Sequence, residues 1–90
     1  MSAYLITYDL NKVGQKYKEV DEEIKKMGVS VRYLDSTWFV KSSLTSQEIV
    51  QKLKQHFDKN DKLFVVEIGK NRQGLLTPSE WTYLKDNVFN

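Results

Sequence analysis

Residues 29–41 read VSVRYLDSTWFVK. Apolar and β-branched residues alternate with polar ones at period two on both sides of Asp35 and Ser36, a pair typical of tight turns. The stretch therefore predicts a β-hairpin, with one strand over residues 29–33 and the next over residues 37–41. Helix and strand signals alternate on either side of this hairpin.

The chain before the hairpin predicts one strand and one helix. Residues 4–8 are rich in β-forming side chains, and Asp9 closes the run before a loop that contains Asn11 and Gly14. Apolar residues then recur three and four positions apart, which places them on one face of a helix: Tyr17, Val20, Ile24 and Met27. Gly28 suits the position just past the end of that helix.

The chain after the hairpin predicts a second helix and a fourth strand. Thr45 and Glu48 form a capping-box pair, and apolar residues continue at helical spacing to Phe57, before a polar turn at residues 58–61. Residues 63–68 then form a second short, β-rich apolar run.

A second capping-box pair, Thr77 with Glu80, predicts a helix near the end of the sequence. Pro78 stands at its first helical position, where proline is favoured. The order of elements predicts an α+β fold, a ferredoxin-like βαββαβ sandwich with a four-stranded antiparallel sheet and an added C-terminal helix. We expect residues 1–90 to form one domain.

Right-handed crossovers place both main helices of such a fold on one face of the sheet, which leaves the other face bare. That face is partly apolar in either register, because Phe39, Leu63 and Val65 are hard to leave in water together. Three covers remain open: a second copy of the protein in a homodimer, the C-terminal helix with Trp81 and Leu84, or a nucleic-acid base stacked on aromatic side chains.

Length and composition narrow the class of protein. Ninety residues with 40% hydrophobic content fill one core, and the absence of cysteine excludes disulfides and thiolate zinc sites. No secretory leader stands at the start, and no apolar run approaches the roughly 20 residues of a membrane-spanning helix. A cytoplasmic protein without a membrane partner is therefore expected. A net charge of +2 leaves a nucleic-acid partner open.

The predicted topology gathers polar residues at one end of the sheet. Asp9 and Asp35 meet there and are candidate ligands for a divalent metal, Mg²⁺ or Mn²⁺. The N-terminus of the first helix lies at the same end and offers unpaired N–H groups. The candidate phosphate contacts are Asn11, Lys12, Lys16, Ser36 and Thr37. The alternative is that these aspartates only cap turns, as Asp58 and Asp61 would. His56 is expected to be a helix-end residue.

The motifs Tyr8-Asp9-Leu10-Asn11, Tyr33-Leu34-Asp35-Ser36-Thr37-Trp38 and Asp61-Lys62-Leu63, with Gly14 and Tyr17, resemble those of the SinR-like family of small bacterial proteins. That family is distantly similar to the CRISPR-associated ferredoxin-fold endonucleases and the VapD-like ribonucleases. The resemblance implies that Asp9 meets its copy across a dimer axis and binds a divalent metal for phosphodiester cleavage. It matches Ser36 to the serine of the turn motif. Lys12 and Lys16 stand where those nucleases carry an arginine-rich loop.

Three functions follow as hypotheses. The first is a metal-dependent endonuclease with Asp9 as its catalytic metal ligand. The second is a non-catalytic homo-oligomeric module that binds a nucleotide or a nucleic acid. The third is a protein-interaction module that docks a partner on the bare face of the sheet.

Overall fold

A computed structural model describes residues 1–11 and 17–90. Its helices and strands follow one another in the order β1 (Ser2–Asp9), α1 (Tyr17–Lys25), β2 (Val29–Leu34), β3 (Thr37–Ser42), α2 (Ser46–Leu53), the single 3₁₀ turn η1 (Lys54–His56), β4 (Lys62–Glu67) and α3 (Pro78–Asn87). Each strand and helix expected from the sequence is therefore present. The second helix is shorter than expected, because its last turn tightens into η1 and Phe57 already has extended backbone angles.

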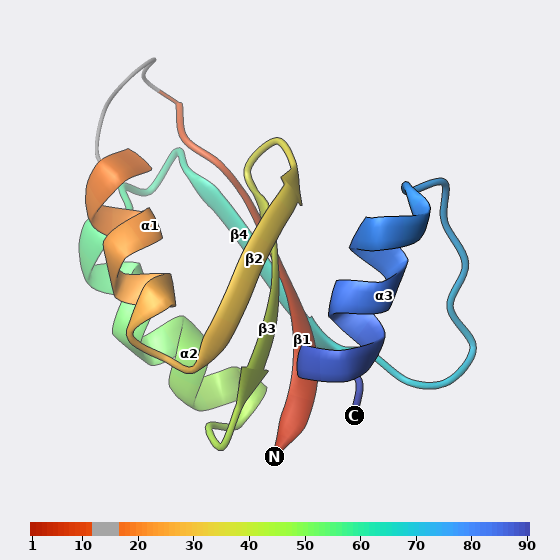
Figure 1. Ribbon diagram of the computed structural model, residues 1–90. Coiled ribbons are helices and arrows are strands. Elements are labelled where there is room, and N and C mark those ends of the chain that lie inside the picture. Colours follow the sequence, from red (N-terminus) through yellow and green to blue (C-terminus); the bar gives the residue numbers. More distant parts are fainter. Residues whose placement is uncertain (12–16) are drawn as a thin grey trace.

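The four strands form one antiparallel sheet in the order β2-β3-β1-β4. The two central strands, β1 and β3, pair with Thr7 opposite Thr37, and β1 pairs with β4 on its other side. The hairpin of β2 and β3 confirms the expectation from residues 29–41. This order is compatible with the ferredoxin-like arrangement that was expected. Figure 1 shows the sheet edge-on between α1 and α2 on one side and α3 on the other.

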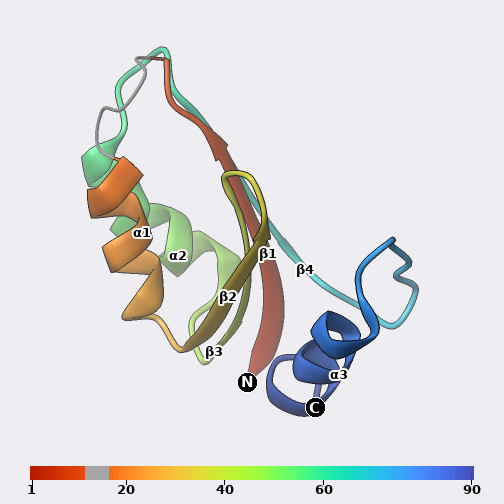
Figure 2. The ribbon, with the colours of Figure 1, turned by 45° about the horizontal axis from the view of Figure 1, so that its top comes forward.

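The main core lies between the sheet and the pair α1 and α2, which cover the same face (Figure 2). Alternate residues of β1 point into it, so Tyr4, Ile6 and Tyr8 are buried. The helices contribute fully buried aliphatic side chains, namely Val20, Ile24, Ile49 and Leu53. Their spacing of four residues is the one from which the helices were predicted. Within the described residues, no helix is long and apolar enough to cross a bilayer.

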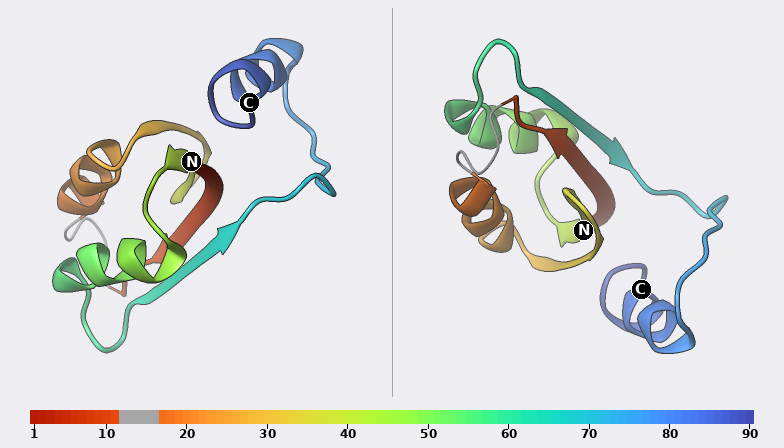
Figure 3. Two further views of the ribbon diagram at one scale, coloured as in Figure 1. Left: turned by 90° about the horizontal axis from the view of Figure 1, so that it is seen from below. Right: turned by 90° about the horizontal axis from the view of Figure 1, so that it is seen from above.

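The other face of the sheet is partly covered by α3, which the two views of Figure 3 show on the side away from α1 and α2. Leu84 of this helix and Val88, its C-cap, are almost wholly buried, and the Phe89 ring meets Phe39 of β3 edge-on, with centroids 6.4 Å apart. Of the three covers expected for this face, the chain's own C-terminal helix is therefore present. Thr77 and Glu80 form the predicted capping box at its start.

The register of β4 differs from one expectation. Leu63 and Val65 do not share a face with Phe39, because both pack against the main core. Phe64 and Val66 point to the α3 side instead, where their residues are 64% and 41% exposed. Residues 63–66 are all apolar, so both faces of this strand are apolar. The sequence pattern therefore does not show which side chains face the main core.

Gly28, between α1 and β2, is required by a close approach of two backbone segments. It has φ +154°, and a Cβ built there would lie 2.0 Å from the carbonyl oxygen of Lys41. Any side chain would push β3 away. Beside it, the buried Ser42 hydroxyl donates to the carbonyl of Met27 and accepts from the backbone N–H of Leu44.

Candidate functional site

The turn of the β2–β3 hairpin is tied to the end of β1. The backbone N–H of Tyr8 donates to the carbonyl of Ser36 at 3.1 Å, and Ser36 itself has a left-handed φ of 50°. The hydroxyls of Thr7 and Thr37 lie 3.0 Å apart across the two strands, and Thr37 also donates to the carbonyl of Asp35. Ser36 and Thr37 therefore lie next to the residues that precede Asp9, as the topology predicts.

Asp9 and Asp35 are both exposed at this end of the sheet. Asp9 is the last residue of β1 and pairs with Lys62 of β4. Because Tyr8 points into the main core, the Asp9 side chain projects from the opposite face, which is the α3 side. Asp35 lies in the hairpin turn, on the other flank of β1. In residues 1–11 and 17–90, no three Asp, Glu or His side chains gather as a metal-binding group.

Asp61 joins the other loops of this end. Its carboxylate accepts from the backbone N–H of Asn11 at 2.6 Å and from that of Asp58 at 2.8 Å. It thereby fixes the segment after β1 against the turn before β4, which is the turn-capping role that was the alternative to metal binding. Lys12 and Lys16, the predicted phosphate contacts, lie outside the described residues.

A buried polar network lies directly below the Asp9 end of β1. The Tyr8 hydroxyl donates a short hydrogen bond to the Asp21 carboxylate of α1. The Trp38 indole N–H is shared between the Tyr8 hydroxyl at 3.1 Å and Asp21 at 3.3 Å. Arg32 of β2 pairs with the second Asp21 oxygen at 3.3 Å. One carboxylate thus connects α1 with β1, β2 and β3.

This network fixes the protonation of Tyr8. Burial, with the hydrogen bond to Asp21 as the next cause, raises the pKa of Tyr8 from 10.0 to about 12. The phenol therefore stays protonated near neutral pH and acts as a hydrogen-bond donor rather than a base. Sequence reasoning assigned no role to Asp21 or Arg32. Tyr8 of β1 and Trp38 of β3 both lie on the inward face of the sheet. A buried phenol hydroxyl and a buried indole N–H each need a hydrogen-bond acceptor, and this requirement could have pointed to a nearby carboxylate.

His56 belongs to a different part of the molecule. Its Nε2 lies 3.4 Å from a carboxylate oxygen of Glu23 on α1, and it forms the last residue of η1. The contact joins α1 to the end of the second helical segment. This placement agrees with the expected role at a helix end.

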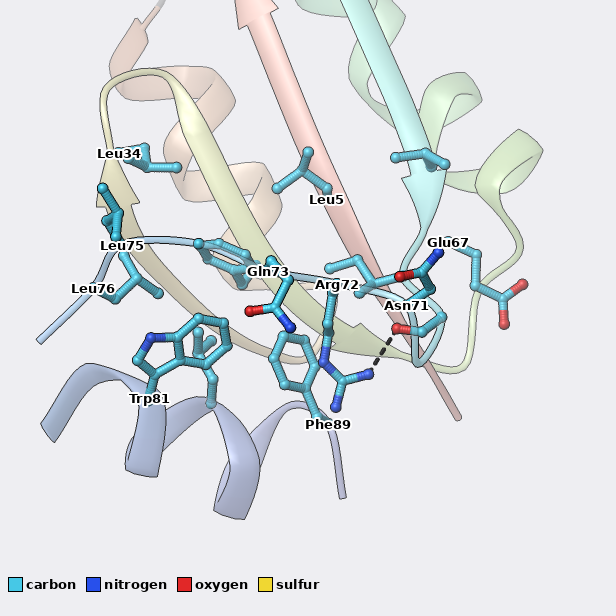
Figure 4. A pocket seen from close by; sticks show the side chains of 16 residues that line it. Leu5, Leu34, Glu67, Asn71, Arg72, Gln73, Leu75, Leu76, Trp81 and Phe89 are labelled. Atoms are coloured by element: carbon cyan, nitrogen blue, oxygen red, sulfur yellow. Dashed lines mark hydrogen bonds between the residues drawn. The ribbon is translucent and has the colours of Figure 1, made fainter. Parts of the chain in front are cut away.

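A groove opens between the sheet and α3, and its lining runs from Leu34, beside the hairpin turn, to Gly69, after β4. It encloses about 400 Å³. Its walls are Leu5, Phe39 and Val66 of the sheet, Trp81 and Leu84 of α3, and the connection from Gly69 to Leu76. Figure 4 shows Trp81 of α3, and Phe89 just after the end of that helix, pointing toward that connection. We call this cavity the α3 groove. Sequence reasoning named the helix as a cover but did not anticipate the space left beneath it.

No protein-family model matches the chain, and the comparison with solved structures found no match. Two features of the molecule bear on its function, the polar end of the sheet around Asp9 and the apolar α3 groove.

Proposed function

We propose that this protein is a homodimeric, nucleic-acid-associated protein with a ferredoxin-like sandwich and an added C-terminal helix. In this proposal two Asp9 carboxylates, one from each copy, hold Mg²⁺ or Mn²⁺ for phosphodiester cleavage. The observation that carries it is the exposure of Asp9 on the same face of the sheet as an uncovered aromatic residue, Phe64. The strand order β2-β3-β1-β4 and the resemblance to the SinR-like family support the choice of fold.

The proposed dimer contact is the part of the sheet that α3 leaves uncovered. Phe64 is 64% exposed and lies opposite Thr7, two residues before Asp9 on the same face. Leu34, at the end of β2, is 50% exposed and forms the rim of the α3 groove beside this uncovered part. Exposed apolar groups on one face favour burial against a partner. Two sheets that meet here about a two-fold axis would bring each Asp9 toward its copy.

The donor chemistry fits a hard divalent cation only in the dimer. One copy offers Asp9, with Asp35 on the other flank of β1, whereas Mg²⁺ prefers one or two carboxylates completed by water and substrate phosphate. A cation there would lower the pKa of bound water and stabilise charge on the phosphoryl group. The chain's own contribution is positioning: Asn11, Ser36 and Thr37, with Lys12 and Lys16, are the proposed phosphate contacts.

Thermal melting with and without Mg²⁺ or Mn²⁺ tests the proposal, together with cleavage of labelled RNA and DNA. Metal at 100 times its Kd should stabilise the wild-type protein by about 2.7 kcal/mol. Asp9→Asn should abolish that stabilisation and any cleavage, while its melting temperature in chelator stays near that of the wild type. Asp86→Asn, which removes an exposed carboxylate of α3, is the matched control.

An unchanged wild-type melting temperature in both metals, with neither nucleic acid cut, would reduce Asp9 to a turn residue. The second candidate function would then apply, a non-catalytic homo-oligomeric module that binds a nucleotide, a nucleic acid or a protein partner. The α3 groove favours this candidate, because it is a preformed concave surface at a distance from Asp9. Binding of labelled nucleic acid without turnover would support it.

A further inference from the structure

The α3 groove has the size and lining of a small-molecule site. Its volume of about 400 Å³ lies at the lower end of the roughly 300–1,000 Å³ typical of ligand pockets. Leu5 and Phe39 form its floor, and Trp81 and Leu84 form the opposite wall. Such a lining takes an apolar body. A hydrocarbon chain or a flat ring would remove these side chains from water.

One cation is held in the wall of this apolar space. The Arg72 guanidinium donates to the carbonyl of Gly69 at 2.7 Å and lies 3.9 Å from the centre of the Phe89 ring. These two contacts fix the orientation of the guanidinium. Its other N–H groups do not donate to Gly69 and remain available to a ligand. Across residues 1–11 and 17–90, Arg72 forms no ion pair. The one acidic residue of the lining, Glu67, directs its carboxylate away from the groove in Figure 4.

A second cavity continues beyond Arg72. It encloses about 220 Å³, shares Glu67, Gly69, Arg72 and Phe89 with the α3 groove, and adds Lys70, Ser2 and Asn90. An apolar space thus leads past a guanidinium into a polar space lined by one more cationic residue, Lys70, and one acidic residue, Glu67. An apolar cavity followed by a cationic group suits a ligand with an apolar body and an anionic head.

We propose that the α3 groove binds a small amphipathic carboxylate, such as a medium-chain fatty acid, with its carboxylate at Arg72 and its hydrocarbon chain between Phe39 and Trp81. A planar guanidinium recognises a carboxylate through paired, charge-assisted hydrogen bonds. The apolar walls supply affinity for the chain, and Arg72 supplies the preference for an acid over an alcohol. This site is independent of Asp9.

Titration calorimetry with decanoate and with decanol, its uncharged counterpart, tests the proposal. The 90-residue chain should bind decanoate about tenfold more tightly than decanol, the order expected for a charge-assisted hydrogen bond. Arg72→Gln should bring the ratio close to one. Lys54→Gln removes an equal charge from an exposed position in η1, on the other face of the sheet, and should keep the wild-type ratio.

A variant that fills the groove tests the location. A Cβ at Gly74 would meet only the Trp81 ring, at 3.7 Å, so Gly74→Leu should occupy the space without displacing backbone. It should abolish decanoate binding while the circular dichroism melt remains that of a folded protein. Decanoate should also change the fluorescence of the wild-type protein but not that of Trp81→Phe, because Trp38 lies in the main core.

Three results would overturn the proposal. Equal affinities of the wild-type protein for decanoate and decanol would remove the role of Arg72. Decanoate binding that Gly74→Leu leaves unchanged would place the ligand elsewhere. A wild-type dimer in sedimentation that Gly74→Leu dissociates, together with no heat from decanoate, would show that a second copy of the chain fills the groove.

Discussion

Asp21→Ala should lower the free energy of unfolding, because the Asp21 carboxylate is the shared acceptor of the polar network below Asp9. Removing this carboxylate takes away the acceptor of the buried Tyr8 hydroxyl. A buried polar group left without a partner costs about 1–3 kcal/mol. The Trp38 indole loses only one of its two acceptors, because its N–H still donates to the Tyr8 oxygen at 3.1 Å.

The ion pair with Arg32 contributes little to this sum. The Arg32 side chain is 46% exposed and that of Asp21 is 20% exposed, so the pair is worth about 0–1 kcal/mol. The expected loss is therefore about 1–4 kcal/mol in the free energy of unfolding. For a domain of this size that corresponds to a fall of about 4–30 °C in Tm.

Urea unfolding followed by circular dichroism measures the loss. Glu22→Ala is the matched control, because it removes an exposed carboxylate from the next position of α1. It should stay within about 0.5 kcal/mol of the wild type. The network would have no energetic role if Asp21→Ala stayed within the same margin, or if Glu22→Ala were equally destabilised.

Three further predictions concern other parts of the fold. Folding raises the pKa of Tyr8 from 10.0 to about 12, so the free energy of unfolding should fall by about 2–3 kcal/mol as the pH rises from 10 toward 12. In alkaline unfolding measurements, Tyr8→Phe should lack this fall. Gly28→Ala should cost at least about 2 kcal/mol in urea, because its Cβ meets the Lys41 carbonyl, whereas Gly69→Ala, with open space around it, should be near neutral. Leu84→Ala should cost about 2–5 kcal/mol if α3 folds as part of the same cooperative unit, and a value near zero in thermal melts would show that it does not.

Local chemistry in the sequence determined which segments form helices and strands. The alternation in residues 29–41, the capping boxes at Thr45 and Thr77, and the spacing of Val20 and Ile24 each depend on side chains within a few residues of one another. The sequence also predicted that the end of β1 lies beside the hairpin turn, because strand order and direction fix which loops meet.

Tertiary structure alone decided how groups far apart in the chain combine. Tyr8, Asp21 and Trp38 share one hydrogen-bonded network, although no local pattern relates them, because their contact depends on how α1 crosses the sheet. The face taken by Phe64 depends on the register of β4, since residues 63–66 are apolar on both sides. The α3 groove is the space left when a ten-residue helix covers only part of a four-stranded sheet. A sequence records which side chains are apolar, but the volume between two packed layers follows only from where those layers lie.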